Sequence, residues 1–110
     1  MDSIKIKVCD FSKTPGSRYR DEGKKAHSGQ EFREDILEPN FKIALANNQK
    51  LFVDLDGTIG YGTSWLEEVF GGLARAYGKD KVLNILDFKS EEEDYLIDDI
   101  KQYINDAEIQ

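Results

Sequence analysis

Asp54 and Asp56 are the residues of this chain whose type and spacing could most directly do chemistry. They close the apolar run at residues 51–55, and Gly57 follows them. Carboxylate oxygens are ligands that a hard cation such as Mg²⁺ favours, and a carboxylate can act as a nucleophile or as a general acid and base. A simpler role also fits, in which an aspartate ends the strand and an Asp-Gly turn follows it.

Two hydroxyl side chains, Thr63 and Ser64, precede the helical pattern that begins at Trp65. Ser64 and Glu67 have the spacing of a capping box, and a structural N-cap of this kind contributes about 1 kcal/mol. The alternative is a phosphorylation switch, because a helix N-terminus tolerates a phosphate and the added charge would remodel a docking surface. Glu67 and Glu68, one turn further on, would oppose that charge.

Tyr61 lies between Gly60 and Gly62 in the loop that precedes this helix. Glycines supply the unusual backbone angles that a tight loop needs. Tyr61 then either projects into solvent, where an aromatic ring is a good interface anchor, or folds back onto the core. The sequence leaves these two orientations open.

The segment 13–27 is basic, although the whole chain is acidic. Its cationic residues are Lys13, Arg18, Arg20, Lys24 and Lys25. We interpret the segment either as a solvated loop or as a surface for phosphate or an acidic partner, with Arg18 as the best donor. His27 stands alone and no Cys/His cluster accompanies it, so the sequence predicts no metal site and no cofactor.

Composition narrows the possible functions. The chain has 110 residues and a net charge of −7, which suits one domain and disfavours general nucleic-acid binding. Its one cysteine, Cys9, cannot form an internal disulfide. The residues near the N-terminus alternate without a continuous apolar stretch, and nowhere do eighteen apolar residues run together. These features predict a cytoplasmic domain that does not enter a membrane.

Hydrophobic periodicity predicts the elements that hold these residues. Strands are expected at residues 3–11, 51–55 and 82–88, and a short one around 18–20. Helices are expected from the capping box at Ser28 to Glu38, from Pro39 to residue 47, over residues 63–77, and from a second capping box at Ser90 to about residue 107. Gly71 and Gly72 predict a close approach of the third helix to the sheet. The alternation implies an α/β domain with at least one parallel crossover.

One resemblance favours the catalytic role of the aspartates. The stretch 53–59 resembles the first motif of haloacid-dehalogenase-like phosphatases, an apolar strand followed by Asp-x-Asp-Gly-Thr. The resemblance implies that Asp54 is the nucleophile, that Asp56 is the acid/base, and that both help to hold Mg²⁺. The phosphatase family also has a second acidic pair at the end of a later strand. Asp98 and Asp99 form the only later pair that resembles it, but they lie on a predicted helix.

A second resemblance leads to a different function. Residues 62–66 align with the Asp-Ser-Ser-Gly-Leu motif of STAS domains, the sulphate transporter and anti-sigma-factor antagonist domains. Ser64 then corresponds to the serine that is phosphorylated in anti-sigma-factor antagonists. Gly62 replaces the Asp of the motif and Trp65 replaces its Gly, and the loss of that Asp puts phosphorylation in doubt.

A longer resemblance covers nearly the whole chain. The chain is similar to a family of bacterial and phage STAS-like domains of unknown function, through residues 10–12, 15–18, 28–33, 54–57 and 60–73. The resemblance implies a single STAS-like domain over residues 1–110, with a mixed four- to five-stranded sheet and about three helices. Members sometimes adjoin histidine-kinase-type ATPase domains, which implies a regulatory protein partner.

These observations together predict a non-enzymatic regulatory module that binds a protein, similar to the anti-sigma-factor antagonists. The docking surface is expected at residues 56–62 and the start of the following helix, with a histidine-kinase-type ATPase or an anti-sigma-like regulator as partner. The residues expected to bind it are Gly60, Tyr61, Gly62, Trp65, Glu67, Glu68, Arg18 and Arg20. The alternatives are the Mg²⁺-dependent phosphatase and an interaction protein from a phage or defence locus.

Overall fold

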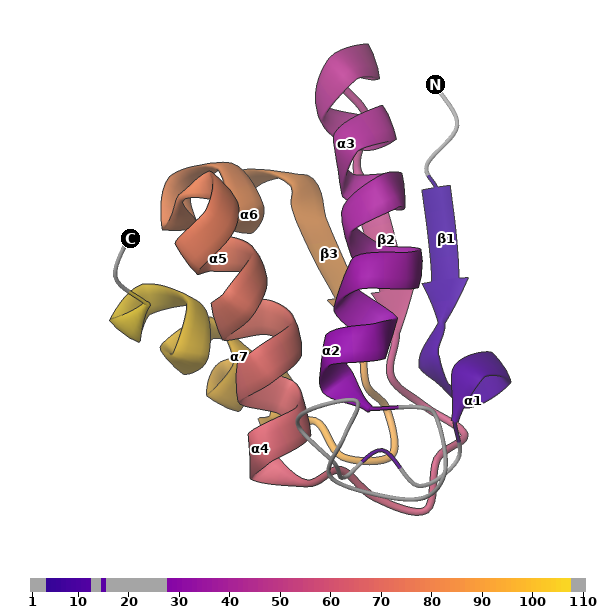
Figure 1. Cartoon of the computed structure of the whole chain (residues 1–110). Helices are drawn as coiled ribbons and strands as arrows, with labels where there is room; N and C mark the ends of the chain where they lie inside the picture. The colour runs from indigo at the N-terminus through magenta and orange to yellow at the C-terminus, as the bar shows by residue number, and fades with distance from the viewer. Residues whose placement is uncertain (1–3, 13–14, 16–27, 108–110) are drawn as a thin grey trace.

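A three-stranded parallel sheet forms the centre of the computed structural model, which describes residues 4–12, 15 and 28–107. The strands are β1 (Ile4–Lys7), β2 (Leu51–Asp54) and β3 (Leu86–Lys89), in the spatial order β1-β2-β3 (Figure 1). Ile4 pairs with Leu51, and Leu51 pairs with Leu86. All three strands therefore end at the same edge of the sheet.

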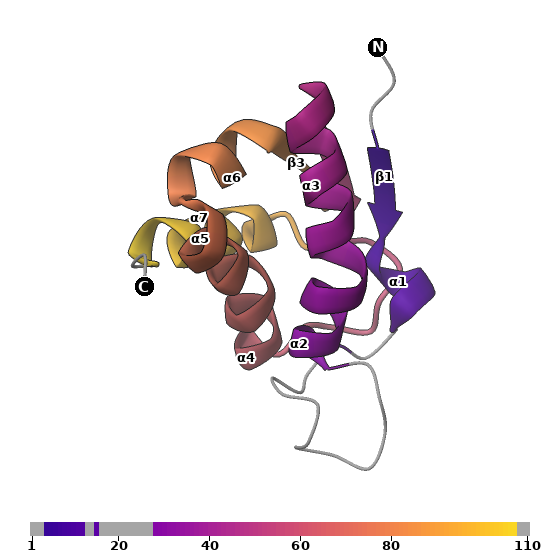
Figure 2. The same cartoon turned by 45° about the horizontal axis from the view of Figure 1, so that its top comes forward.

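Five continuous helical segments accompany the sheet in the described part of the chain. Two of them are long, and each contains one wide π turn. Their parts are α2 (Gly29–Phe32), η1 (Arg33–Leu37) and α3 (Glu38–Asn47), then α4 (Thr63–Leu66), η2 (Glu67–Gly71) and α5 (Gly72–Tyr77). The shorter helices are α1 (Val8–Phe11), α6 (Lys79–Ile85) and α7 (Tyr95–Asp106). Figures 1 and 2 show the two long helices on one side of the sheet.

The hydrophobic core lies between this helical layer and one face of the sheet. Leu51 and Val53 of β2 are fully buried there, whereas Phe52 and Asp54 alternate with them and are half-buried. On β1, Lys5 and Lys7 are exposed. Because successive side chains of a strand point to opposite faces, the sheet has one apolar covered face and one polar face.

The predicted sheet and helix numbers were wrong, although the α/β class is right. The described residues form three parallel strands instead of a mixed sheet of four or five, and five helical segments instead of about three. The first strand stops at Lys7, since residues 8–11 form a helical turn. A strand around residues 18–20 lies outside the described residues.

The segment 82–88 explains part of this difference. Only its last residues form β3, because the helix α6 continues to Ile85. Val82 and Ile85 lie three residues apart and are both buried, which is the spacing of one helix face. A short apolar run fits a helix as well as a strand, and packing decides between them.

The sequence suggested that Pro39 divides the first long helix into two, but the helix continues through this residue. The π turn η1 precedes it, and the N–H of Glu38 donates to the carbonyl of Arg33. A proline has no N–H to donate and its ring needs room near the preceding turn, so a widened turn lets the helix continue through it. The helix then ends as predicted, at Asn48, which has a positive φ of 54°.

Two further predictions need correction. Gly71 and Gly72 lie against side chains and not against the sheet, because a Cβ on Gly72 would come within 2.7 Å of Arg33 Nε. Ser90 does not cap the last helix: its hydroxyl donates to the carbonyl of Glu93, and α7 begins at Tyr95. The Ser28 cap is confirmed, since its hydroxyl accepts a hydrogen bond from the Glu31 N–H.

No helix among residues 4–12 and 28–107 is long and apolar enough to cross a membrane.

Candidate functional site

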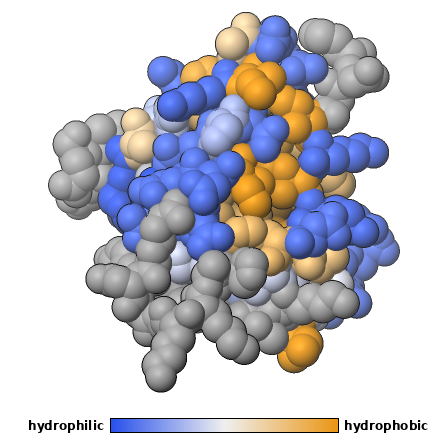
Figure 3. All heavy atoms as spheres, turned by 45° about the vertical axis from the view of Figure 1, so that its right-hand side comes forward, coloured by the Kyte–Doolittle hydropathy of each residue, from blue (hydrophilic) through white to orange (hydrophobic). Residues whose placement is uncertain are grey.

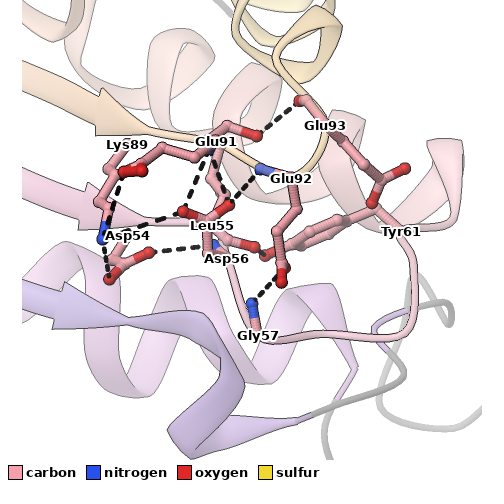
Figure 4. Close-up of polar contacts among 10 residues, drawn as sticks. Asp54, Leu55, Asp56, Gly57, Tyr61, Lys89, Glu91, Glu92 and Glu93 are labelled. Carbon is pink, nitrogen blue, oxygen red and sulfur yellow. Dashed lines mark hydrogen bonds and ion pairs between the residues drawn. The ribbon is translucent and has the colours of Figure 1, made fainter.

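The loops that follow β2 and β3 are bound together at the carboxyl edge of the sheet (Figure 4). The Asp56 carboxylate accepts hydrogen bonds from the backbone N–H groups of Glu91 and Glu92, both with a shortest distance of 2.9 Å. Glu92 returns the contact, since its Oε1 accepts from the Gly57 N–H at 2.7 Å. Asp56 and Glu92 therefore clamp the two loops to each other.

Asp54 stabilises the same turn from its other end. Its Oδ1 accepts the Asp56 N–H at 3.0 Å, which is the aspartate-initiated turn that the Asp-Gly pattern allowed. Lys89 lies opposite both carboxylates, with Nζ 4.0 Å from an oxygen of Asp54 and 4.0 Å from one of Asp56. The N–H of Glu92 chiefly lowers the pKa of Asp56, and the N–H of Glu91 and the charge of Lys89 add to this against partial desolvation.

Asp56→Asn is expected to change how stability depends on pH. A carboxylate whose pKa is lowered by folding contributes stability that is present above its unfolded pKa, about 3.9, and is lost as the pH falls through the folded value. At pH 7 we expect Asp56→Asn to lower the free energy of unfolding by about 1 kcal/mol, which is below the range of about 1.5–3 kcal/mol for a hydrogen bond to a charged group because water reaches the loop. The loss should shrink as the pH falls below about 4 and through the lower folded pKa of Asp56.

Urea unfolding followed by circular dichroism from pH 2 to pH 7 measures this difference. Asp87→Asn is the matched control, because Asp87 is an exposed carboxylate on the neighbouring strand β3. If both variants lost the same stability at every pH, the clamp would have no special role in folding.

These contacts bear on the phosphatase hypothesis without testing it. Asp54 is the last residue of the strand β2 and Asp56 lies two residues beyond it, which agrees with the placement that the resemblance implied. The acceptor oxygens of Asp56 already receive two backbone N–H groups, and its lowered pKa is unsuited to a general acid near neutral pH. Within the described residues, no group of three or more His, Cys, Asp or Glu side chains is placed to hold a metal ion. A phosphatase role stays a prediction.

The loop 56–62 is held in one shape from both ends. Gly57 has a φ of 92°, and a Cβ there would come within 3.0 Å of Cys9 Sγ, so the turn requires glycine. The Tyr61 hydroxyl donates to the carbonyl of Leu55 at 2.7 Å. The N–H of Gly62 donates to the carbonyl of Pro15 at 2.8 Å.

Tyr61 takes the second of its two predicted orientations. Its half-buried ring packs against Trp65, with ring centroids 5.7 Å apart, and burial raises the pKa of its hydroxyl. It is therefore part of the support of the loop and not a free anchor. The exposed apolar group of this loop is Ile59 instead, whose side chain is 83% accessible.

Thr63 and Ser64 are exposed in the first turn of α4. The predicted Ser64 cap is wrong, because Gly62 occupies the N-cap position and no side chain in the described part of the chain caps this helix end. The backbone entering from Gly62 is extended, so the helix starts two residues before the position that the Ser64–Glu67 spacing suggested. The helix starts without a cap from either hydroxyl, and both hydroxyls lie at the surface.

Three other residues that were predicted to contact a partner instead contact other residues of this chain. Trp65 is fully buried, with its ring 5.1 Å from Phe32. Glu68 is 5% exposed and accepts a hydrogen bond at 2.8 Å from Arg33. Glu67, half-buried, pairs with Arg75. Trp65 and Glu68 thus contact the core instead of a surface. The predicted binding residues Arg18 and Arg20 lie outside the described residues.

Two residues of this site were missed by sequence reasoning. Ile59 carried a signal, since it is the one large aliphatic residue between Gly57 and Gly62. Glu92 carried none, because three consecutive glutamates look alike in sequence and only the tertiary fold brings this one to Gly57.

A family model described as a STAS-like domain of unknown function matches residues 28–96. The match begins at the Ser28 cap, spans β2, the loop 56–62, both long helices and β3, and ends just inside α7. No curated protein and no solved structure matches the chain.

Proposed function

The chain belongs to the family of STAS-like domains of unknown function, and from that premise we propose that it is a non-enzymatic regulatory module that binds another protein. Its docking surface consists of the loop 56–62 and the exposed first turn of α4. The partner we expect is a histidine-kinase-type ATPase or an anti-sigma-like regulator. The support for this partner is the similarity to anti-sigma-factor antagonists.

One observation carries the proposal: Ile59 is presented to solvent on a loop that hydrogen bonds hold near both ends. Hydrogen bonds at Asp56, Gly57 and Tyr61 hold that loop. A preordered loop loses little conformational entropy on binding, so more of the contact energy appears as affinity. Loops on a rigid scaffold, at the carboxyl ends of parallel strands, are also where α/β folds commonly bind their ligands.

Ser64 supports a switch at the same surface. Its hydroxyl is exposed beside Thr63 at the start of a helix, where backbone N–H groups tolerate a phosphate. The objection from Glu67 and Glu68 is weaker than their sequence positions suggest, because each is paired with an arginine. Phosphorylation would then add charge to the docking surface and lower the affinity for the partner.

Ile59→Asp and Ser64→Asp are expected to weaken capture of the partner by at least about tenfold, which is about 1.4 kcal/mol. The measurement is affinity capture from the native host with quantitative mass spectrometry, followed by titration of the captured protein. Ile43→Asp is the matched control, because Ile43 is a 50% exposed isoleucine on α3.

The control should capture as much as the wild-type chain. A partner retained equally by wild type, Ile59→Asp and Ser64→Asp would place the docking surface elsewhere. Loss of the same partner in Ile43→Asp would mean that surface charge in general controls its capture.

A further inference from the structure

The outer edge of β1 is an unpaired strand edge within the described part of the chain. The sheet order places β1 at the edge, beside β2 alone. The N–H of Ile4 donates to the carbonyl of Lys50, towards β2. Because peptide groups alternate in direction along a strand, those of Lys5 and Lys7 point to the open edge. Such an edge can accept one further strand.

An apolar groove runs beside this edge, between β1 and the long helix that contains α2 and η1. It encloses about 460 Å³ and its apolar lining consists of Ile6, Phe11, Phe32 and Ile36. Figure 3 looks onto this side of the molecule and shows an apolar band between polar margins. The rest of the lining is polar and carries both signs of charge, since it consists of Lys5, Lys7, Asp10, Glu31 and Asn40, so the apolar side chains are what set the groove apart. The groove therefore favours apolar side chains.

The opposite face of β1 favours acidic side chains instead of apolar ones. Lys5 and Lys7 are exposed on the polar face of the sheet, and neither forms an ion pair with another described residue. A strand added at this edge would place alternate side chains directly beside these lysines, where carboxylates are favoured and cations are not.

We propose that β1 binds an extended segment of another protein in which apolar and acidic residues alternate. The segment adds a fourth strand: its backbone pairs with Lys5 and Lys7, its apolar side chains fill the groove, and its carboxylates lie beside the two lysines. A second copy of this chain is the poorer occupant. Pairing β1 with itself about a two-fold axis would bring the lysines of one copy against those of the other.

The probe is a pool of capped peptides of about six residues, long enough to span β1 at roughly 3.3 Å per residue. Glutamate alternates in them with valine, isoleucine, leucine or phenylalanine, and a second pool has lysine in place of glutamate. The immobilised full chain should retain the glutamate pool at least about tenfold better than the lysine pool. Amide shifts of the labelled chain with the best peptide should centre on β1 and residues 31–40.

Two variants test the charge preference. Lys5→Glu with Lys7→Glu should reduce retention of the glutamate pool by about tenfold and favour the lysine pool. Lys79→Glu with Lys81→Glu changes the net charge equally on exposed positions of α6 and should alter retention by less than about twofold. Ile59→Asp should also leave retention unchanged, which separates this surface from the proposed docking loop.

The backbone contribution has its own test. Methylating alternate backbone nitrogens of the selected peptide removes its strand hydrogen bonds and should weaken binding by at least about tenfold. The proposal is overturned if neither pool is retained, if both pools bind equally, or if the methylated peptide binds as well. Self-association of the wild-type chain with shifts confined to β1 would make a second copy the occupant and overturn it too.

Discussion

Trp65→Ala is expected to lower the free energy of unfolding by about 3–5 kcal/mol, the range for removing a large aromatic side chain from a core. Trp65 is fully buried between Phe32 and Tyr61. It also lies where two helices approach closely, since a Cβ on Gly29 would come within 3.0 Å of the Trp65 carbonyl oxygen. Because the two helix backbones are already in close contact, they cannot move together to fill the cavity that Trp65→Ala leaves.

The loss of Trp65 should also reach the proposed docking loop. Tyr61 rests against the Trp65 ring, so amide hydrogen exchange at residues 57–62 should accelerate in Trp65→Ala before the chain unfolds globally. Urea unfolding gives the stability and exchange mass spectrometry gives the loop order. Trp65→Phe is the control, and it should lose less because an aromatic ring still fills most of the site.

This prediction separates two roles of Trp65. If Trp65 were a contact residue, Trp65→Ala would abolish partner capture at nearly unchanged stability. If Trp65 is a core residue, the same substitution lowers partner capture and stability together. A cost below about 1 kcal/mol, the level of an ordinary surface substitution, would mean that Trp65 is not the core residue described above.

Glu68→Ala is expected to cost about 2–3 kcal/mol of folding stability. Breaking a buried ion pair costs about 3–5 kcal/mol when one partner is left without compensation, and here part of that cost is avoided. Arg33 keeps its contact with Glu38, and its side chain is 17% exposed. Its Nε already lacks a hydrogen-bond partner among the described residues, so the loss of Glu68 leaves a second part of the guanidinium unsatisfied.

Glu67→Ala is the matched control, since Glu67 is the preceding residue and also pairs with an arginine. Both members of the Glu67–Arg75 pair are more than a quarter exposed, so we expect a cost of less than about 1 kcal/mol. Urea unfolding at neutral pH measures both variants. Equal losses in the two variants would contradict the special role of Arg33 and Glu68 in joining the two long helices.

Several predictions from sequence depended on local pattern and were confirmed. The strand expected at residues 51–55 is β2, which ends at Asp54, and the helix over residues 63–77 runs unbroken from Thr63 to Tyr77. Gly78, with a φ of 96°, ends it. The Ser28 cap and the family were also predictable, because capping residues and a long unusual block of sequence are local features.

Predictions about which way a side chain faces were less successful. Tyr61, Trp65 and Glu68 were expected on a docking surface, and the structure turns each of them towards the core. Trp65 lies in the first turn of an amphipathic helix, and which side of that helix is covered depends on where the helix 29–47 packs. The pairing of Arg33 with Glu68 spans 35 positions of sequence, so no local pattern announces it.

The sequence by itself determined the α/β order, the buried strand that ends at Asp54, the tryptophan-bearing helix and the family. Residue periodicity and capping chemistry act over a few neighbouring positions, and they are legible in a single chain. Tertiary structure alone decided that the described strands are three and parallel, that Asp56 and Glu92 clamp two loops, and that Ile59 is presented to solvent. Burial and hydrogen-bond partners depend on which distant segments meet, and that choice is made by the whole core at once.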